Sequence, residues 1–312
     1  MRGASVGLGL AVLSATTFGT SGSFAASLMA AGWSPGSAVT VRIGLAAVVL
    51  TVPAVLQLRG RWGLLRRDLP AILAYGLLAV AGAQLFFFNA VDHLSVGVAL
   101  LLEYSGTLLV VGWAWLRHGH RPRRLTVLGA ALAIAGLVLV LDLTGSQHVD
   151  GVGVLWGLGA ATGLAAYFVL SSRVDGGLPP IAMAWAGMVV GGTVLLLAGL
   201  TGVIALRAST ADADFNGSHT SWIVPVLGLS LIAAVVAYAA GIGAARRLGA
   251  RLASFIGLTE VLAAVLFAWL LLGQRPSVLQ GVGGVVVLAG IALVRADEPE
   301  LAVETEAELE PV

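Results

Sequence analysis

Three charged side chains lie well inside long apolar stretches of this sequence: Arg42, Glu103 and Glu260. Each costs about 2.5 to 3.5 kcal/mol at the centre of a membrane helix on insertion scales, so an intramembrane charge usually has a function. As a functional residue, Glu103 could bind the ammonium group of a substrate or exchange a proton. Burial disfavours the charged carboxylate, which would suit proton exchange. The structural alternative is a neutral or paired Glu that only joins two helices.

The other two charges allow similar alternatives. Glu260 follows a polar neighbour, Thr259, so a functional and a structural role are equally open. The planar guanidinium of Arg42 matches a carboxylate, which could belong to a substrate. It could also belong to Glu103, with Arg42 as a structural counter-ion.

Several uncharged residues are candidates for the wall of a cavity between the helices. Thr16, Thr20, Ser23 and Ser27 are separated by four, three and four positions, so they share one helical face. They could form a polar path, or they could make the hydrogen bonds between helices that are common in membranes. Tyr104 is a candidate because it adjoins Glu103, although neighbouring side chains on a helix diverge by about 100°. The remaining candidates are Gln84, Asn89, Trp156, Tyr167 and Tyr238.

Composition identifies an integral membrane protein. Hydrophobic residues make up 58% of the 312 residues and charged residues 11%, and the mean hydropathy is +0.98, whereas a soluble domain has about 25% charged residues. There is no Lys for a P-loop and no Cys for a disulfide or thiolate site. Any active transport therefore draws on a gradient or on a partner protein.

The elements that must position these residues are about ten membrane helices, since about 20 mostly apolar residues cross a bilayer. Apolar windows between breaks at Arg, Pro and Gly predict an all-α polytopic protein. The start of the chain resembles a signal peptide, but its apolar run is long, so an uncleaved first helix is expected. The predicted spans are 5–29, 35–57, 69–91, 94–116, 125–142, 151–172, 180–205, 221–244, 248–272 and 277–294.

The distribution of Arg predicts the topology. With a cytoplasmic N-terminus, twelve Arg residues fall in loops on the inside and only Arg207 and Arg275 fall in loops on the outside. This bias follows the positive-inside rule. We therefore expect a multi-pass protein of the plasma membrane with both termini in the cytoplasm. The outside loop 207–220 and the acidic tail 296–312 are predicted to be unstructured.

An internal repeat divides the chain. At an offset of 154 residues, "LTVLGAALAIAGLVLV" (125–140) aligns with "LQGVGGVVVLAGIALV" (279–294), and Trp115 aligns with Trp269. Five spans separate the copies, so the two halves have opposite orientations, as in many secondary transporters. The predicted domains are a five-helix repeat at 1–145, a second at 146–295, and the tail. At this offset Glu103 and Glu260 lie three residues out of register.

The ten spans, Arg42 early in the second span and "GQRPSVLQGVGGVVVLAGIALV" near the end of the chain resemble the EamA branch of the drug/metabolite transporter superfamily. The stretch "SVGVALLLEYSGTLLV" (95–110) is similar to the fourth-span motif of threonine/homoserine exporters. The resemblance covers about residues 5–295. It implies two inverted repeats and export of small metabolites, with amino acids such as threonine and homoserine as the expected substrates.

The favoured hypothesis is a secondary transporter that works by alternating access and is driven by protons. A uniporter, a channel and a membrane scaffold remain open alternatives. An enzyme is disfavoured because the five His residues lie in or at loops and there is no HExxH motif or intramembrane Asp pair. We expect no cofactor, no metal and no nucleic-acid partner. The expected partners are a small-molecule substrate, the lipid bilayer and protons, and a homo-oligomer remains open.

Overall fold

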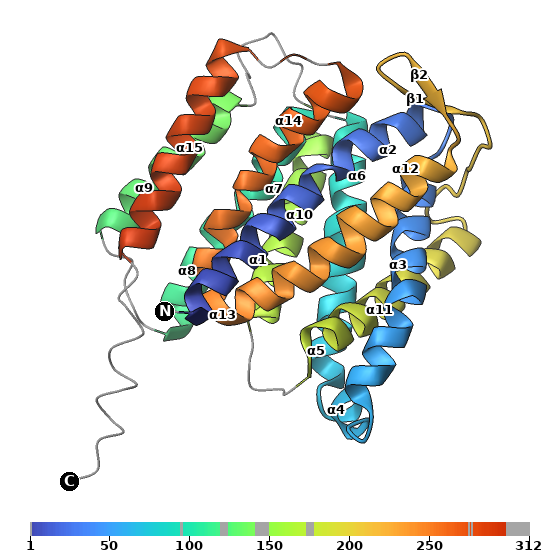
Figure 1. The fold of residues 1–312 in the computed structure, drawn as a ribbon, viewed down its shortest axis with the longest axis horizontal. Helices are drawn as coiled ribbons and strands as arrows, with labels where there is room; N and C mark the ends of the chain where they lie inside the picture. Colours follow the sequence, from blue (N-terminus) through green and yellow to red (C-terminus); the bar gives the residue numbers. More distant parts are fainter. Residues whose placement is uncertain are drawn as a thin grey trace.

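The computed structural model describes residues 2–93, 96–118, 124–140, 150–172, 178–273, 275 and 277–297. Figure 1 shows the helices of both halves side by side in one bundle. The first half contains α1 (Arg2–Gly19), α2 (Ser21–Ala30), α3 (Pro35–Leu58), α4 (Gly63–Arg67), α5 (Leu69–Ala74), the π-helix η1 (Tyr75–Gly82), α6 (Ala83–His93), α7 (Val96–Tyr104), α8 (Gly106–His118) and α9 (Arg124–Val140). The second half contains α10 (Gly151–Ser171), α11 (Pro180–Leu200), the strands β1 (Ala213–Phe215) and β2 (Ser218–Thr220), α12 (Ile223–Leu227), the π-helix η2 (Gly228–Val236), α13 (Ala237–Gly257), α14 (Thr259–Leu272) and α15 (Val278–Asp297).

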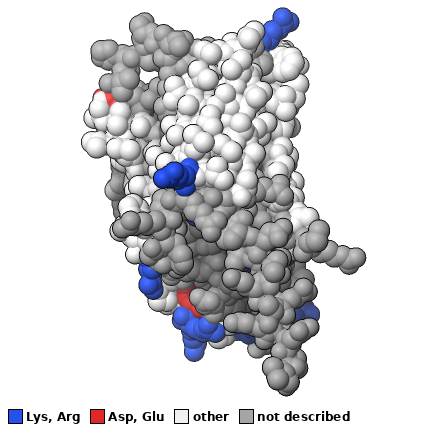
Figure 2. All heavy atoms as spheres, turned by 90° about the vertical axis from the view of Figure 1, so that its left-hand side faces the viewer, with Lys and Arg blue, Asp and Glu red and all other residues white. Residues whose placement is uncertain are grey.

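The prediction of a helical membrane protein is confirmed. Five helical segments in the described ranges are long and apolar enough to cross a membrane: Pro35–Leu58, Leu69–Ala90, Gly151–Ser171, Pro180–Leu200 and Ile223–Gly257. The other predicted spans correspond to shorter or interrupted helices. Figure 2 shows a wide uncharged area on one face, with several Arg side chains gathered toward its lower end. An uncharged flank of this kind suits contact with lipid.

Three predicted spans are interrupted at a hydroxyl residue or directly before one. The breaks fall at Thr20, Ser105 and Leu258, the last of which precedes Thr259. The Ser105 hydroxyl donates to the Leu102 carbonyl over 2.5 Å, and the Thr259 hydroxyl donates to the Ile256 carbonyl over 2.7 Å. Bonds from a side chain to a carbonyl of the preceding turn compete with the helical pattern. Ser105 and Thr259 are separated by 154 residues, so the same break occurs in both repeats.

The two π-helices also obey the repeat. Residues 75–82 of η1 correspond to residues 229–236, which lie within η2, at the same offset of 154. π-helical segments are rare and often lie at functional sites. Here they place two equivalent carbonyl groups, those of Ala79 and Ala233, inside the bundle.

A bend at Gly249 separates the two legs of the long segment Ile223–Gly257. Gly249 has φ 77° and ψ 162°, a conformation that favours Gly because it has no Cβ. The predicted spans 221–244 and 248–272 therefore follow one another without a loop, and the chain changes direction at Gly249. The part of α13 before Gly249 belongs to the first of these spans, and the part after it belongs to the second.

α9 and α15 form a closely packed pair with small residues at the contact. A Cβ atom added at Gly129 would lie 2.7 Å from the Gly290 carbonyl oxygen, and one added at Gly136 would lie 2.6 Å from the Val287 nitrogen. Backbones approach this closely only where a side chain is absent. Figure 1 shows the pair at one side of the bundle.

The prediction that the loop 207–220 is unstructured was wrong. β1 and β2 form an antiparallel hairpin in which Phe215 pairs with Ser218. Asn216 and Gly217 between them have positive φ angles of 53° and 81°, as a two-residue hairpin turn requires. The loop is anchored by the Trp33 indole, which donates to the Ser209 carbonyl over 2.7 Å. We call this end of the bundle the hairpin end, and the opposite end, which holds α4, the α4 end.

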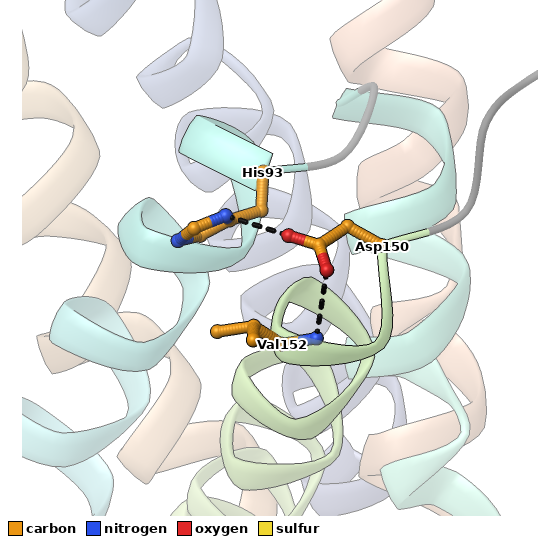
Figure 3. Close-up of polar contacts among 3 residues, drawn as sticks. All are labelled: His93, Asp150 and Val152. Carbon is orange, nitrogen blue, oxygen red and sulfur yellow. Dashed lines mark hydrogen bonds and ion pairs between the residues drawn. The ribbon is translucent and has the colours of Figure 1, made fainter.

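A further polar contact between the two repeats lies at the hairpin end (Figure 3). His93 Nδ1 at the end of α6 lies 2.9 Å from Asp150 Oδ2, directly before α10. The other Asp150 oxygen accepts a hydrogen bond from the Val152 N–H over 3.1 Å and so caps α10. Both side chains are partly exposed, so this pair stabilises the connection only modestly.

Some predictions fall outside the described residues. They include the acidic tail from residue 298 onward and the arginines at positions 121, 123 and 173. α15 continues to Asp297, two residues into the predicted tail.

Candidate functional site

The three intramembrane charges converge on one cavity, although they lie far apart in the sequence. Arg42 lies on α3, Glu103 near the end of α7, and Glu260 near the start of α14. All three, together with Gln84 of α6, line a cavity of about 190 Å³. We call these four residues the charged layer and this cavity the larger cavity.

Arg42 is held by protein groups. Its side chain is buried, and one terminal nitrogen, Nη1, donates to the Ser21 hydroxyl over 3.0 Å and to the Gln84 side-chain oxygen. The other, Nη2, donates to the Ala233 carbonyl in η2. The guanidinium also lies 5.9 Å from the ring centre of Phe18. Nε is buried without a hydrogen-bond partner, so one edge of the guanidinium is unsatisfied.

No carboxylate in the described part of the chain forms an ion pair with Arg42 within 4.0 Å. Glu103 and Glu260 interact with it only at longer range. A tight structural pair of Arg42 with Glu103, one of the alternatives left open by the sequence, is therefore not present. A buried charge without a close ion-pair partner is costly.

The helix breaks explain the register of the two carboxylates. Glu103 lies two residues before the break at Ser105, and Glu260 lies two residues after the break at Leu258. Because the repeats are inverted, opposite directions along the chain correspond to the same direction along the bundle. Both carboxylates therefore lie on the hairpin side of their breaks and line the same cavity.

A smaller cavity of about 50 Å³ lies on the other side of the charged layer, toward the α4 end. It is lined by Tyr104, Tyr167 and Tyr238 and shares four lining residues with the larger cavity: Phe18, Gln84, Glu103 and Glu260. The Tyr104 side chain is close enough to interact with the Glu260 carboxyl group. The shared residues therefore separate two spaces that point to opposite ends of the bundle.

Aromatic rings fill the boundary of the smaller cavity. The ring centre of Tyr167 lies 6.1 Å from that of Phe18, 5.6 Å from that of Tyr238 and 6.1 Å from that of Tyr75. These edge or tilted contacts are typical of stable aromatic clusters. A Cβ atom added at Gly241 would lie 1.7 Å from the Tyr167 hydroxyl oxygen, so this Gly makes room for the ring.

Gln84 and Tyr238 meet between the halves and are equivalent at the repeat offset of 154. The Tyr238 hydroxyl also donates to the Ala79 carbonyl in η1 over 3.3 Å, while Arg42 donates to the equivalent Ala233 carbonyl in η2. Each π-helix thus receives a side-chain donor from outside it. The repeat symmetry places these contacts where the halves meet.

The structure places four predicted lining residues away from both cavities. Thr16 is exposed, and Thr20 donates to the Thr17 carbonyl over 2.7 Å. Asn89 donates to the Leu85 carbonyl over 2.7 Å, and Trp156 stacks near Phe86. Hydroxyl and amide groups that bond to their own helix need no cavity, which sequence spacing alone does not reveal.

The sequence prediction overlooked other lining residues. Ser14 and Phe18 of α1 and Ser21 and Gly22 of α2 line one or both cavities. Phe18, Gly22, Ala25 and Met29 recur at intervals of four, three and four, which is a detectable helical stripe. In the described residues no group of three His, Cys, Asp or Glu side chains has the arrangement of a metal site.

Comparisons with known proteins agree with this architecture. Residues 5–142 and 151–296 each match the model of the EamA-like transporter family. The whole fold is similar to that of a solved crystal structure, with a TM-score of 0.75 and 18% identity over 98% of this chain and 99% of the other.

Curated relatives include transporters. The uncharacterized transporter YdfC of Bacillus subtilis is 25% identical over 228 residues, which are 72% of this chain and 71% of that protein. The pseudopaline exporter CntI of Pseudomonas aeruginosa is 32% identical over 87 residues, which are 28% of this chain and 27% of CntI. A WAT1-related chloroplast protein of Arabidopsis thaliana is 28% identical over 238 residues, which are 73% of this chain and 55% of that protein.

Proposed function

The chain belongs to the EamA-like transporter family, and from this premise we propose that it exports amino acids or closely related small metabolites across the plasma membrane by proton-coupled alternating access. The observation that carries the proposal is the charged layer, in which two carboxylates and one guanidinium face a cavity between the repeats. A zwitterion offers an ammonium for the former and a carboxylate for the latter.

Glu103 and Glu260 bind the ammonium group in this proposal. Both carboxylates line the larger cavity, and neither has an ion pair within 4.0 Å in the described part of the chain. Charge-assisted hydrogen bonds to such groups are short and strong. The ammonium therefore replaces the water that the buried carboxylates have lost.

Arg42 receives the carboxylate of the substrate. Its Nη1 is committed to Ser21 and Gln84, while its Nε carries an N–H without a partner. A carboxylate that binds this edge side-on contacts the free Nε N–H and the neighbouring Nη2, which otherwise donates to the Ala233 carbonyl. A small shift of the surrounding side chains brings this edge into the cavity.

Proton coupling follows from the unfavourable free energy of buried carboxylates that have no cationic partner when no substrate is bound. Without the substrate ammonium, neither buried carboxylate has a cationic group within 4.0 Å in the described part of the chain. A proton on one carboxyl group then takes the place of the ammonium, because a buried charge neutralises itself when it has no partner. An inward flow of protons can thereby drive outward flow of substrate.

Alternating access uses the two cavities on either side of the charged layer. The Arg distribution favours cytoplasmic termini, so the larger cavity at the hairpin end faces outward. Movement of the repeats would open the smaller cavity toward the cytoplasm and close the larger one. Export is also the activity in the name of the relative CntI.

The test is transport of labelled amino acids by purified protein in liposomes with an imposed pH gradient. We expect wild type to respond to the gradient, and Glu103→Gln to lower gradient-driven transport about tenfold or more, because it removes a charged partner of the ammonium. Asp212→Asn, which changes an exposed carboxylate in the outer loop, is the matched control and should behave as wild type.

Two results would change the proposal. Transport that ignores the pH gradient and survives in Glu103→Gln would indicate a uniporter and contradict the proton role. If neither wild type nor variant moves any amino acid, with or without the pH gradient, the assignment of amino acids as substrates is wrong.

A further inference from the structure

The larger cavity has a polar end and an apolar end. The charged layer and the Ser21 hydroxyl bonded to Arg42 lie at its floor, and the walls toward the hairpin end are apolar except for Ser23. The residues of these walls are Gly22, Ala25, Ala26 and Met29 of α2, Phe87 and Phe88 of α6, Leu100 of α7, and Ala264, Ala268 and Leu272 of α14. A bound amino acid with its charged groups at the floor must direct its side chain along these walls.

From this arrangement we infer that the site selects amino acids with apolar side chains and that Gly22 sets the largest side chain it accepts. This inference rests on the proposed function and narrows the substrate class. It differs from the expectation of threonine or homoserine that the sequence resemblance raised. The walls offer a hydroxyl group few partners, and burying an unpaired hydroxyl is unfavourable.

Gly22 lies at the centre of the lining stripe. Gly22, Ala25 and Met29 lie on one face of α2, so a side chain at position 22 would point the same way as these lining neighbours. A Cβ atom added at Gly22 would meet no heavy atom within 4 Å. Position 22 therefore opens onto free space in the cavity, unlike Gly19, where a Cβ atom would lie 2.6 Å from the Ala263 side chain.

The wall formed by α14 also presents small side chains along one helix face. Glu260, Ala264, Ala268 and Leu272 recur every four residues along α14, so the carboxylate and the small side chains share one face. The cavity of about 190 Å³ exceeds the roughly 150 Å³ that accommodates a benzene ring in an engineered protein interior. A side chain of the size of leucine or phenylalanine fits this space.

The test compares exchange of valine, threonine, leucine, phenylalanine and alanine by the full-length protein in liposomes. Valine and threonine have nearly the same shape, so the ratio of their exchange rates reports the polarity of the cavity walls. We expect wild type to prefer valine over threonine by about fivefold or more. A preference for threonine would overturn the inference while leaving amino-acid transport intact.

Size selection is tested with Gly22→Ala and Gly22→Val. Gly22→Val should lower leucine and phenylalanine exchange about tenfold or more relative to alanine exchange, since small volume changes in a binding pocket have effects of this order. Gly22→Ala should have a smaller effect in the same direction. Gly9→Val is the control, because Gly9 of α1 also opens onto free space but lines neither cavity.

The outcomes distinguish failure of the role assigned to Gly22 from failure of the proposed amino-acid transport. Equal loss of all five substrates in both Gly22 variants, or the same selectivity change in Gly9→Val, would overturn the role of Gly22. Absence of any amino-acid exchange in wild type would instead refute the proposed function, and the inference about side chains with it.

Discussion

At the scale of single residues, Arg42 connects three elements around the larger cavity. Ser21, Gln84 and the Ala233 carbonyl come from three different elements, and all three accept hydrogen bonds from this one side chain. The sequence indicates that an Arg this deep in a span must have partners. It does not identify those partners, because they lie 21, 42 and 191 positions away.

Arg42→Lys is expected to impair transport of amino acids, although the charge is retained. A single ammonium cannot replace the planar fork of the guanidinium, so exchange of valine should fall about tenfold or more. Isobutylamine, which lacks the carboxylate of valine, should compete for the site equally well in wild type and variant. Equal loss of binding for both compounds, measured by competition, would mean that Arg42 acts only on structure.

At the scale of elements, the interruptions of the helices determine where functional groups lie. Ser105 and Thr259 lie at or directly after a helix break and make equivalent bonds to Leu102 and Ile256. Each break, at Ser105 and at Leu258, has a carboxylate two residues away. Hydroxyl residues are common in membrane helices, and most do not break them. The positions 105 and 259 are visible in the sequence, whereas the breaks themselves depend on how the surrounding helices pack.

The α9–α15 pair gives a test of packing at this scale. Gly290→Val should destabilise the protein, because an added Cβ atom would lie 2.6 Å from both the Ala133 nitrogen and the Gly129 carbonyl oxygen. Overpacking of this kind costs about 1 to 3 kcal/mol.

Thermal unfolding in detergent measures this effect, and the midpoint should fall by several degrees. Gly281→Val on the same helix is the control, since a Cβ atom there would meet nothing within 4 Å. Equal midpoints for the two variants would contradict the close contact.

At the scale of the whole molecule, the inverted repeat accounts for a two-sided site. The family match in each half and the offset of 154 between the π-helices describe one unit used twice in opposite orientations. Two cavities that share Phe18, Gln84, Glu103 and Glu260 are the consequence. Inverted repeats of this kind are common in secondary transporters, and the proposed alternating access relies on this symmetry.

The orientation in the membrane can be measured directly because the chain has no native Cys. Thr210→Cys in the outer loop should react with a membrane-impermeant maleimide on intact cells, since the positive-inside rule places this loop outside. Gly63→Cys at the α4 end should react only after the cells are permeabilised. The reverse pattern would invert the topology and the direction of the larger cavity.

The sequence by itself determined the class of the protein, the repeat and its offset, and the three charges within the membrane. These depend on hydropathy and spacing, which are local properties. Only the tertiary structure decided which residues face the cavities: it brought Tyr104, Tyr167 and Tyr238 there and left out Thr16, Thr20, Asn89 and Trp156. In lipid both faces of a helix are apolar, so the hydrophobic pattern that separates inside from outside in a soluble protein is weak here.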